Sequence, residues 1–361
     1  MGGYGATGKA VVSELWKSCL GDIAIAGRDA TKARALAAQF DKRVTATSVD
    51  VLDNSALDAF CEQCSIIINC AGPVMLLQDR VAQAAFRNKC HYVDPAGLGL
   101  IKERILPNSH HIEELGLSFV ISAGWMPGIS ELVPAYAVAQ ARVKMDSIDS
   151  VTVCFADSGE WSDNALRDGV WFVRRTGLRS PGYFHRGEWT RAKTAAAFRK
   201  IDLGSPVGLR RFGLFSTPEF AELGRSLKDC DFFSYAYLSG WQTAMAATVM
   251  AAVPLPESMS VRMLRNTFRR NRLPVDGFAW ARAVGHSGGD KLTLTVQIVY
   301  RERRDYWIHG LALAAVVRLI CEGKGIKPGV HFAVDAVDST AFMAELRKAG
   351  VEQTQELKSC N

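Results

Sequence analysis

Three glycines open the chain at the spacing that a dinucleotide-binding loop requires. Gly2, Gly5 and Gly8 are three residues apart, and an amphipathic segment, residues 9–16, follows them directly. In such a loop the first glycine makes a tight turn, the second lets backbone approach a pyrophosphate, and the third allows close packing. The N-terminus of the following helix would direct its N–H groups at a bound phosphate. The pattern indicates an anion site, although a glycine turn before an ordinary helix uses the same residues.

The next apolar stretch, residues 22–29, ends in Gly27-Arg28-Asp29. In dinucleotide-binding folds an acidic residue at this point binds the ribose 2′-hydroxyl of NAD, whereas an arginine accommodates the 2′-phosphate of NADP. Arg28 therefore favours NADP, with NADPH as the reduced form. Asp29 keeps NAD open, and a solvated arginine at the start of a helix is the plainer alternative.

A sheet is needed to position these residues. Apolar or β-branched stretches alternate with helical patterns, and the expected strands lie within residues 22–29, 44–51, 65–73, 91–97 and 117–128. This alternation predicts an α/β fold: a Rossmann-type doubly wound parallel sheet with ligands at the carboxyl ends of its strands. Such a sheet also has a strand before its glycine loop. We interpret the missing strand as a start placed too late; the alternative is a fold without its central strand, whose neighbours would have unpaired edges.

Further cofactor contacts are expected where the third and fourth strands end. Asp50 and Val51 end one strand, and Ala71-Gly72-Pro73 ends the other, at the sheet edge where adenine and nicotinamide should lie. Helix capping is the competing role for Asp50, and a plain turn is the competing role for residues 71–73. The expected cofactor-binding residues are Gly2, Tyr4, Gly5, Ala6, Thr7, Arg28, Asp50, Val51, Ala71, Gly72 and Pro73.

The pattern changes after Pro134. Alternating strands and a loop-rich basic stretch follow, which predict an inserted α+β substrate domain with a mostly antiparallel sheet. A long apolar helix begins after Tyr306. We expect a Rossmann domain over residues 1–130, the substrate domain over residues 131–305, and a C-terminal segment, residues 306–361, that returns to the Rossmann domain.

Composition is that of an ordinary globular protein, with 361 residues of which 48% are hydrophobic and 22% charged. No apolar run reaches the roughly 18 residues that span a bilayer, and no signal-peptide pattern is present, so a cytoplasmic location is expected. The nine scattered cysteines do not suggest a disulfide framework. Cys61 and Cys64 form one C-x-x-C without the further ligands of a zinc site, so we predict no metal.

Basic residues are concentrated in the middle of the chain. The net charge is +6, and residues 160–272 hold 18 Lys and Arg against 10 Asp and Glu. Pairs such as Arg174-Arg175 would attract an acidic substrate or protein, with a merely solvated surface as the alternative. No nucleic-acid-binding motif accompanies them, and we expect neither nucleic-acid nor membrane binding.

Six segments together resemble the saccharopine dehydrogenase-like reductases. They are GGYGATGK, AGR, INCAGP, HYVDPAG, SAGWMPG and GKGIKPGV, and they occur in order through nearly the whole chain. The resemblance implies an NADP-binding Rossmann domain, an inserted substrate domain, and reduction of a C=N bond or oxidation of the corresponding secondary amine. Short-chain dehydrogenases use a Tyr-x-x-x-Lys pair, which none of the eight tyrosines forms.

Reduction of an imine also requires a general acid that protonates the nitrogen. Asp94, Tyr183 and His185 are the candidate catalytic residues. The competing roles are a turn-holding carboxylate for Asp94 and solvated loop residues for the other two.

The chain is similar to one branch of the family, the thiazolinyl imine reductases of enantio-pyochelin-type siderophore biosynthesis. That similarity implies a small-molecule substrate, a thiazoline tethered to an acidic carrier protein. A saccharopine- or opine-type amine dehydrogenase and a non-catalytic NADP-binding redox sensor are the alternatives. A homodimer also stays open.

Overall fold

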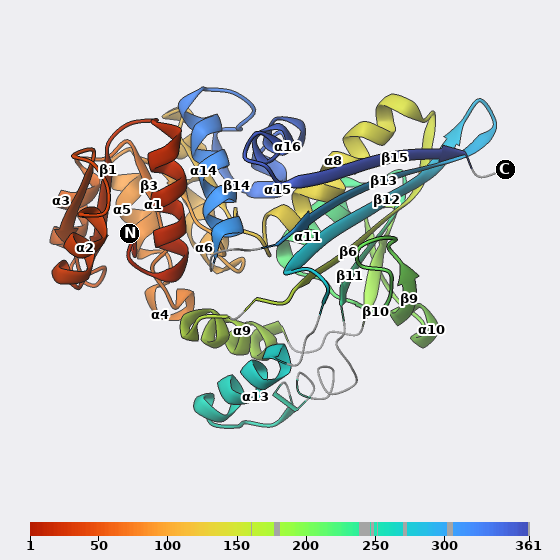
Figure 1. The fold of residues 1–361 in the computed structure, drawn as a ribbon, viewed down its shortest axis with the longest axis horizontal. Coiled ribbons are helices and arrows are strands. Elements are labelled where there is room, and N and C mark those ends of the chain that lie inside the picture. The colour runs from red at the N-terminus through yellow and green to blue at the C-terminus, as the bar shows by residue number, and fades with distance from the viewer. Residues whose placement is uncertain are drawn as a thin grey trace. The chain divides into compact units, whose positions relative to one another are not determined.

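The computed structural model describes residues 1–159, 161–176, 181–237, 246, 249–250, 252–269, 273–301 and 306–359. Contacts divide the chain into two compact units (Figure 1). Unit 1 comprises residues 1–129 and 302–349, and unit 2 comprises residues 130–301 and 350–361.

Unit 1 is an α/β unit in which all strand pairs are parallel. Its strands are β1 (Ile23–Gly27), β2 (Val44–Ser48), β3 (Ile66–Ile68), β4 (His91–Val93), β5 (Ser118–Ile121) and β14 (Gly329–Phe332). Its helices are α1 (Ala6–Ser18), α2 (Ala30–Ala37), α3 (Asn54–Cys61), α4 (Val74–Leu77), α5 (Arg80–Arg87), α6 (Leu100–Ile105), the 3-10 helix η1 (Leu106–Asn108), α7 (Ser109–Glu114), α14 (Trp307–Cys321), α15 (Ala333–Ala336) and α16 (Ser339–Lys348). Short apolar strands such as β5, which is buried throughout, are typical of a parallel sheet covered on both faces. The predicted Rossmann-type fold class is confirmed.

The parallel strands form two sheets that meet at the first residues of the chain. One sheet is β1-β2 and the other has the order β14-β5-β4-β3. The Met1 amine donates to the Ile68 carbonyl at 2.8 Å, and the Met1 carbonyl accepts from the Cys70 N–H at 2.9 Å. The Gly2 N–H donates to the Ala26 carbonyl at 2.8 Å. Backbone of residues 1 and 2 therefore joins the carboxyl ends of β1 and β3, while among the described strands β1 pairs only with β2 and β3 only with β4.

The returning segment packs helix α14 directly against α1 (Figure 1). A Cβ added at Gly310 would lie 2.5 Å from the backbone carbonyl carbon of Ala10, so glycine allows the two helices to approach closely. Arg318 donates to the Ser18 hydroxyl at 2.8 Å and forms an ion pair with Glu345 at 2.9 Å. This half-buried guanidinium joins α1, α14 and α16.

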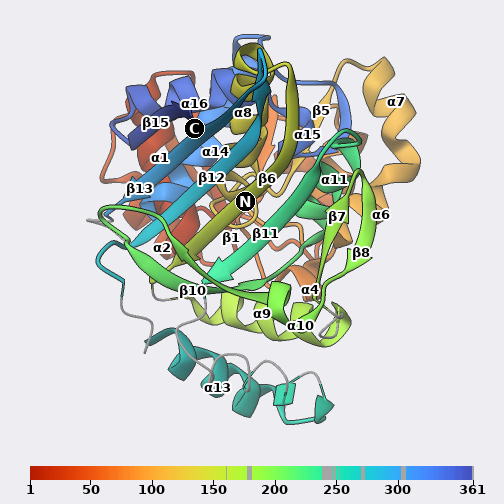
Figure 2. The same cartoon turned by 90° about the vertical axis from the view of Figure 1, so that its right-hand side faces the viewer.

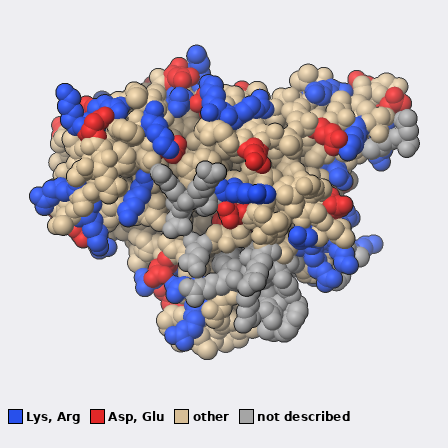
Figure 3. Space-filling view, viewed as in Figure 1, with Lys and Arg blue, Asp and Glu red and all other residues tan. Residues whose placement is uncertain are grey.

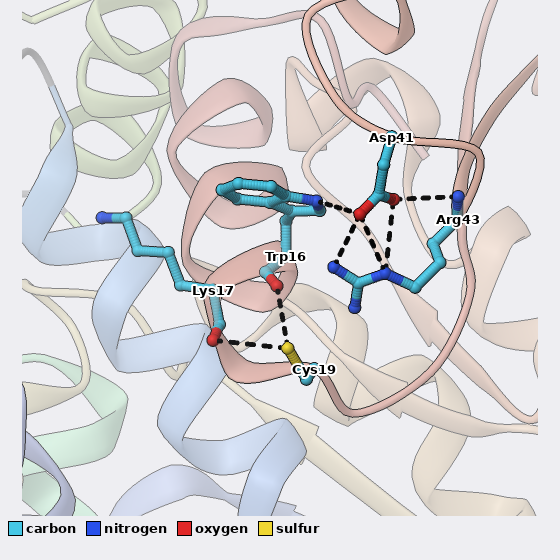
Figure 4. A network of polar contacts seen from close by, with 5 residues as sticks. All are labelled: Trp16, Lys17, Cys19, Asp41 and Arg43. Atoms are coloured by element: carbon cyan, nitrogen blue, oxygen red, sulfur yellow. Dashed lines mark hydrogen bonds and ion pairs between the residues drawn. The ribbon is translucent and has the colours of Figure 1, made fainter.

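The C-terminal end of α1 is held by a second polar network (Figure 4). The Trp16 indole donates to the Asp41 carboxylate at 3.1 Å, and Arg43 donates to the same carboxylate through its guanidinium and its backbone N–H. The Arg43 hydrogen bonds hold the pKa of Asp41 below its usual value. The network attaches α1 to the connection between α2 and β2, and so fixes the helix whose other end carries the glycine loop.

Unit 2 contains a nine-stranded sheet that is mostly antiparallel, as expected (Figure 2). Its strands are β6 (Ser147–Asp157), β7 (Gly182–His185), β8 (Glu188–Arg191), β9 (Phe198–Asp202), β10 (Leu209–Leu214), β11 (Asp231–Tyr237), β12 (Gly277–Ser287), β13 (Asp290–Tyr300) and β15 (Glu352–Ser359). Its described helices are α8 (Ile129–Lys144), α9 (Asp163–Thr176), α10 (Thr194–Ala197), α11 (Pro218–Ser226) and α13 (Glu257–Arg269). The central order is β15-β13-β12-β6-β11-β10-β9, and only β6 and β11 are parallel among the described pairs.

The end of the chain differs from the sequence-based expectation. Residues up to Ala349 belong to unit 1, whereas β15 pairs antiparallel with β13 and extends the sheet of unit 2. Its side chains are almost all exposed, because an edge strand has little to cover it.

None of the helices in the described part of the chain is long and apolar enough to cross a membrane.

Candidate cofactor and active site

The glycine loop is built so that two of its three glycines cannot be replaced without moving backbone. Gly2 has φ of 69°, and a Cβ there would lie 2.7 Å from the Ala71 nitrogen. A Cβ at Gly8 would lie 2.3 Å from the Gly2 carbonyl oxygen. The loop therefore closes on itself and against the turn that follows β3.

The space around Gly5 is more open than that around Gly2 and Gly8. A Cβ there would have only one neighbour within 4 Å, the Gly2 carbonyl oxygen at 3.2 Å. Gly5 is the N-cap of α1, which has no side-chain cap and no acidic residue in its first turn. The N–H groups of Ala6 and Thr7 therefore lie at an uncapped helix N-terminus beside open space. A pyrophosphate fits this arrangement of donors and helix dipole.

Tyr4 contacts the end of β1. Its hydroxyl accepts from the Asp29 N–H at 3.0 Å, and a Cβ at Gly27 would lie 2.5 Å from the Tyr4 ring. The ring thus fixes the turn that presents Arg28.

The carboxylate beside Arg28 is already engaged. Asp29 caps α2 by accepting from the Lys32 N–H at 3.0 Å, and its carboxylate lies 3.3 Å from the Lys32 ammonium. The hydrogen bond from the Lys32 backbone lowers the pKa of Asp29. Arg28 is exposed, and its guanidinium has no hydrogen bond or ion pair with the described part of the chain. The Arg28 guanidinium is therefore available to bind a phosphate, whereas the Asp29 carboxylate caps helix α2.

Replacement of Arg28 tests this assignment. Arg28→Ala should weaken NADPH binding by about 1.5–3 kcal/mol, the range for a hydrogen bond to a charged group, and should change NADH binding little. Fluorescence titration with both cofactors measures the difference. Arg34→Ala is the matched control, because Arg34 is an exposed arginine within α2 and its side chain donates to the Ala30 carbonyl. Equal losses for the two cofactors would contradict the role given to Arg28.

Of the two cofactor-binding residues predicted after β2, Asp50 lies in a turn and Val51 lies in the core. The Asp50 carboxylate accepts from the Leu52 N–H at 3.0 Å, and the expected helix cap is instead Asp53, which accepts from the Ala56 N–H. The Val51 side chain is buried in the core of unit 1. A cofactor at this position would therefore meet the exposed Asp50 side chain and the backbone of Val51.

The turn after β3 is supported by a buried polar chain. Asn69 accepts from the Ala71 N–H at 3.1 Å and donates to the Tyr92 hydroxyl at 3.0 Å. Asn69 is 4% exposed, and the Tyr92 side chain is fully buried. Burial, with the Asp94 carboxylate beside it, raises the pKa of Tyr92 well above its usual value. A cis peptide joins Gly72 to Pro73, which is the N-cap of α4. Tyr92 thus supports the predicted Ala71-Gly72-Pro73 segment from beneath.

Asp94 lies at the carboxyl end of β4 and is 2% exposed. Its carboxylate accepts from the Ser122 N–H at 3.1 Å, and its backbone carbonyl accepts from the Ala123 N–H at 2.7 Å. A Cβ at Gly97 would come within 3.2 Å of the carboxylate. These contacts join the turn after β4 to the segment after β5, so Asp94 organises the sheet edge on which the candidate nicotinamide-side residues lie.

His309 is a half-buried residue at this edge that the sequence pattern did not single out. Its Nδ1 accepts from the Trp125 N–H at 3.3 Å, across 184 positions in the chain. Loss of water around its ring lowers the pKa of His309 to about 4. With Nδ1 as acceptor, the neutral ring carries its proton on Nε2. Helix α14 thereby fixes the backbone that follows Gly124.

The other two candidate catalytic residues belong to unit 2. Tyr183 and His185, expected on a loop, lie on β7 of the hairpin β7-β8, with Arg186 and Gly187 at positive φ in its turn. Tyr183 stacks on Phe233 with ring centroids 4.6 Å apart. His185 Nδ1 lies 2.7 Å from the Asp231 carboxylate, and its side chain is 57% exposed. The two side chains share one face of β7, because they are two residues apart on a strand.

Cys61 and Cys90 are buried thiols at the opposite, amino-terminal ends of β3 and β4. The Cys90 thiol donates to the backbone carbonyls of Cys61 and Cys64, at 3.2 and 3.0 Å. Burial raises the pKa of Cys61 to about 12 and that of Cys90 to about 11. Among the described residues no group of three or more His, Cys, Asp or Glu could hold a metal ion.

On the face drawn in Figure 3, Lys and Arg side chains are scattered, and Asp and Glu side chains lie among them. Arg174 is engaged within unit 2, donating to the Leu255 carbonyl and the Ser260 hydroxyl. The Arg175 guanidinium lies 5.1 Å from the Trp171 ring centroid. Arg174 and Arg175 were the pair expected to attract an acidic partner. The Arg174 side chain instead binds the residues at the start of α13.

Residues 1–115 match a family model described as the saccharopine dehydrogenase NADP binding domain. The N-terminal part of the chain is an NADP(H)-binding domain. The sequence-based cofactor prediction is confirmed, and so is the resemblance to the saccharopine dehydrogenase family for these residues. The matched region contains the glycine loop, Arg28 and every strand from β1 to β4.

Two known proteins extend the comparison. A probable mitochondrial saccharopine dehydrogenase-like oxidoreductase of Arabidopsis thaliana is 32% identical over 136 residues, which cover 34% of this chain and 30% of that protein. The chain thus matches less than a third of that relative's length. The apo structure of saccharopine dehydrogenase (L-Glu forming) from Saccharomyces cerevisiae aligns over 98% of both chains with a TM-score of 0.63 and 13% identity. At that identity the likeness establishes the shared fold.

Proposed function

We propose that the protein is an NADPH-dependent oxidoreductase that reduces a C=N bond to an amine. The observation that carries this proposal is the NADP-binding domain of saccharopine dehydrogenase type, with its glycine loop, uncapped α1 N-terminus and exposed Arg28. An accompanying unit of about the same size favours an enzyme over a redox sensor, because a sensor needs no substrate domain.

The reaction asks two things of the chain. Bound NADPH supplies a hydride for the carbon of the C=N bond. The protein must orient the substrate and provide a proton for the nitrogen. Asp94 is well placed to position backbone, because its carboxylate accepts from Ser122 and is buried.

His185 has the features of a proton donor. Its ring is largely exposed, and its Nδ1 lies 2.7 Å from the Asp231 carboxylate, which orients the ring so that Nε2–H of the protonated imidazole faces away from Asp231 and can donate. Tyr183, two residues earlier, is the second donor candidate in this hairpin. We therefore propose Asp94 as a positioning residue and His185 as the general acid.

The substrate proposed first is the thiazoline ring of a carrier-tethered siderophore intermediate. Aromatic side chains on the sheet of unit 2, such as the stacked Tyr183 and Phe233, suit a flat ring. Arg175, which is exposed beside Trp171, is a cation for an acidic carrier. Amine dehydrogenation of the saccharopine or opine type is the alternative within the same chemistry.

A deuterium-transfer assay tests the function. The protein is incubated with [4-²H]NADPH of each stereochemistry and with either a thiazoline, free or carrier-tethered, or an amino acid plus an aldehyde. We expect NADPH oxidation with one of these classes, and deuterium on the former C=N carbon from one stereoisomer only. Tight NADPH binding without turnover of any imine would contradict the proposal and favour a sensor.

The same assay separates the roles of the histidines. His185→Gln should lower kcat by about 10²- to 10⁴-fold, the usual range for loss of a general acid. His286→Gln is the matched control, because His286 is also exposed on this sheet and also pairs with a carboxylate, Asp149, at 3.3 Å. An equal effect of the two variants would assign the loss to the fold and remove His185 from the chemistry.

A further inference from the structure

We infer that one face of the unit 2 sheet carries a binding site for a carboxylate group, formed by Arg282 of β12 and Gln297 of β13. This inference goes beyond the proposed oxidoreductase function and does not depend on it.

Two neighbouring rows of side chains define the place. In the first row, Phe233, Thr152, Arg282, Thr295 and Glu356 are paired across β11, β6, β12, β13 and β15. In the second row, Tyr235, Cys154, Trp280, Gln297 and Thr354 are paired across the same strands. Residues two apart on a strand share a face, so both rows lie on the same face of the sheet. Arg282 and Gln297 are diagonal neighbours on adjacent strands, within reach of each other's long side chains.

Burial changes sharply between the rows. Thr152, Arg282 and Thr295 are half-buried, whereas Trp280 is 2% and Gln297 is 7% exposed. The Arg282 guanidinium lies over the Trp280 ring, 4.6 Å from its centroid. Arg282 therefore leans along its strand toward the second row, and Trp280 is the direct cross-strand partner of Gln297.

Both side chains have a buried nitrogen without an acceptor. Arg282 Nε and Gln297 Nε2 are shielded from solvent and have no hydrogen-bond partner among the residues that the structure describes. Among the described residues Arg282 has no ion pair, and its guanidinium contacts the Trp280 ring. Buried N–H groups are almost always hydrogen-bonded, so two orphaned donors on one patch call for an external acceptor.

The number and kind of donors point to a carboxylate. The uncompensated charge of Arg282 selects an anion, and two N–H donors match the two oxygens of a planar carboxylate. The threonine hydroxyls that flank Arg282 in its row can add hydrogen bonds. The carboxylate could belong to a small molecule or to an acidic side chain of a second copy of this chain.

Arginine side-chain NMR tests the site. In protein labelled with ¹⁵N-arginine, the Arg282 Nε–H signal is assigned by its loss in Arg282→Lys. Titration with sodium acetate, against sodium chloride at equal ionic strength, should shift this signal saturably in the wild type. Gln297→Leu should weaken acetate binding by about tenfold or more, because one hydrogen bond to the anion is lost. Arg225→Lys, an exposed substitution on α11, should leave the titration unchanged.

Stability gives a second measurement that does not require spectral assignment. Gln297→Leu replaces an orphaned amide by an apolar group of similar size, so without acetate its Tm should equal or exceed that of the wild type. Acetate should raise the Tm of the wild type and of Arg225→Lys, and should not raise that of Gln297→Leu or Arg282→Lys.

The outcomes are distinct. A saturable shift with acetate supports a free carboxylate. A shift that already appears without acetate, grows with protein concentration and accompanies dimer formation in sedimentation supports a carboxylate from a second copy. A linear response that chloride reproduces, together with a lower Tm for Gln297→Leu, would overturn the inference and leave these side chains bonded to each other or to water.

Discussion

Gly5→Val is expected to keep the fold of unit 1 and to weaken NADPH binding by about 100-fold or more, which corresponds to about 2.7 kcal/mol. The fold should survive because φ at Gly5 is −69° and an added Cβ meets only one atom within 4 Å, at 3.2 Å. Affinity should fall because the branched side chain occupies the space through which a pyrophosphate reaches the α1 N-terminus. Calorimetric titration with NADPH and a thermal melt measure the two properties separately.

Two further glycine substitutions make this experiment decisive. Gly5→Ala adds one methyl group at the same place and should give an intermediate loss of affinity. Gly8→Ala should instead lower the Tm, because its Cβ would lie 2.3 Å from the Gly2 carbonyl oxygen and 2.6 Å from backbone of Gly3. A folded Gly5→Val protein with wild-type affinity for NADPH would show that the loop is only a turn.

Features that depend on neighbouring residues could be predicted from the sequence. The glycine loop, the arginine after β1 and the turn at residues 71–73 each occupy a few consecutive positions, and each lies where a βα unit places its ligand-binding residues. Alternation of short apolar strands with helices was sufficient to predict the parallel sheet of unit 1.

Features that depend on distant residues could not be predicted. The bond between His309 and the Trp125 backbone spans 184 positions, and nothing in either local sequence marks the other as its partner. Asn69 and Tyr92 are similarly joined only because parallel strands β3 and β4 are adjacent. The sequence of β15 shows no apolar pattern that predicts a strand, because an exposed edge strand can be polar on both faces.

The hairpin at residues 182–191 illustrates a third reason. Strand β8, Glu188–Arg191, is exposed or half-buried at every position, so it lacks the alternation that identifies a strand. The sheet forms because β7 pairs with β11, and because Phe184 packs on Trp189 and on α11 through Gly224. A Cβ at Gly224 would lie 2.3 Å from the Phe184 ring. Tertiary packing therefore determines that this segment is a hairpin, although its own residues resemble those of a loop.

Acidification should destabilise the protein through His309. The unfolded histidine has a pKa of about 6.5, and burial lowers the pKa in the folded protein to about 4. Between these values the unfolded chain binds more protons, so the free energy of unfolding should fall as the pH falls from about 6.5 to about 4. The full loss is on the order of 3 kcal/mol, and none of it is expected above pH 7.

His309→Asn isolates this contribution. The asparagine oxygen can accept from the Trp125 N–H but does not titrate, so the variant should lose most of the pH dependence between 6.5 and 4 that the wild type shows in urea unfolding. His91 also has a pKa lowered by burial and adds a slope of the same sign, which both proteins retain. His110→Asn is the control, because the His110 side chain is 86% exposed. If His309→Asn keeps the wild-type slope, His309 is charged in the folded protein, and the neutral ring that holds the segment after β5 is the wrong description.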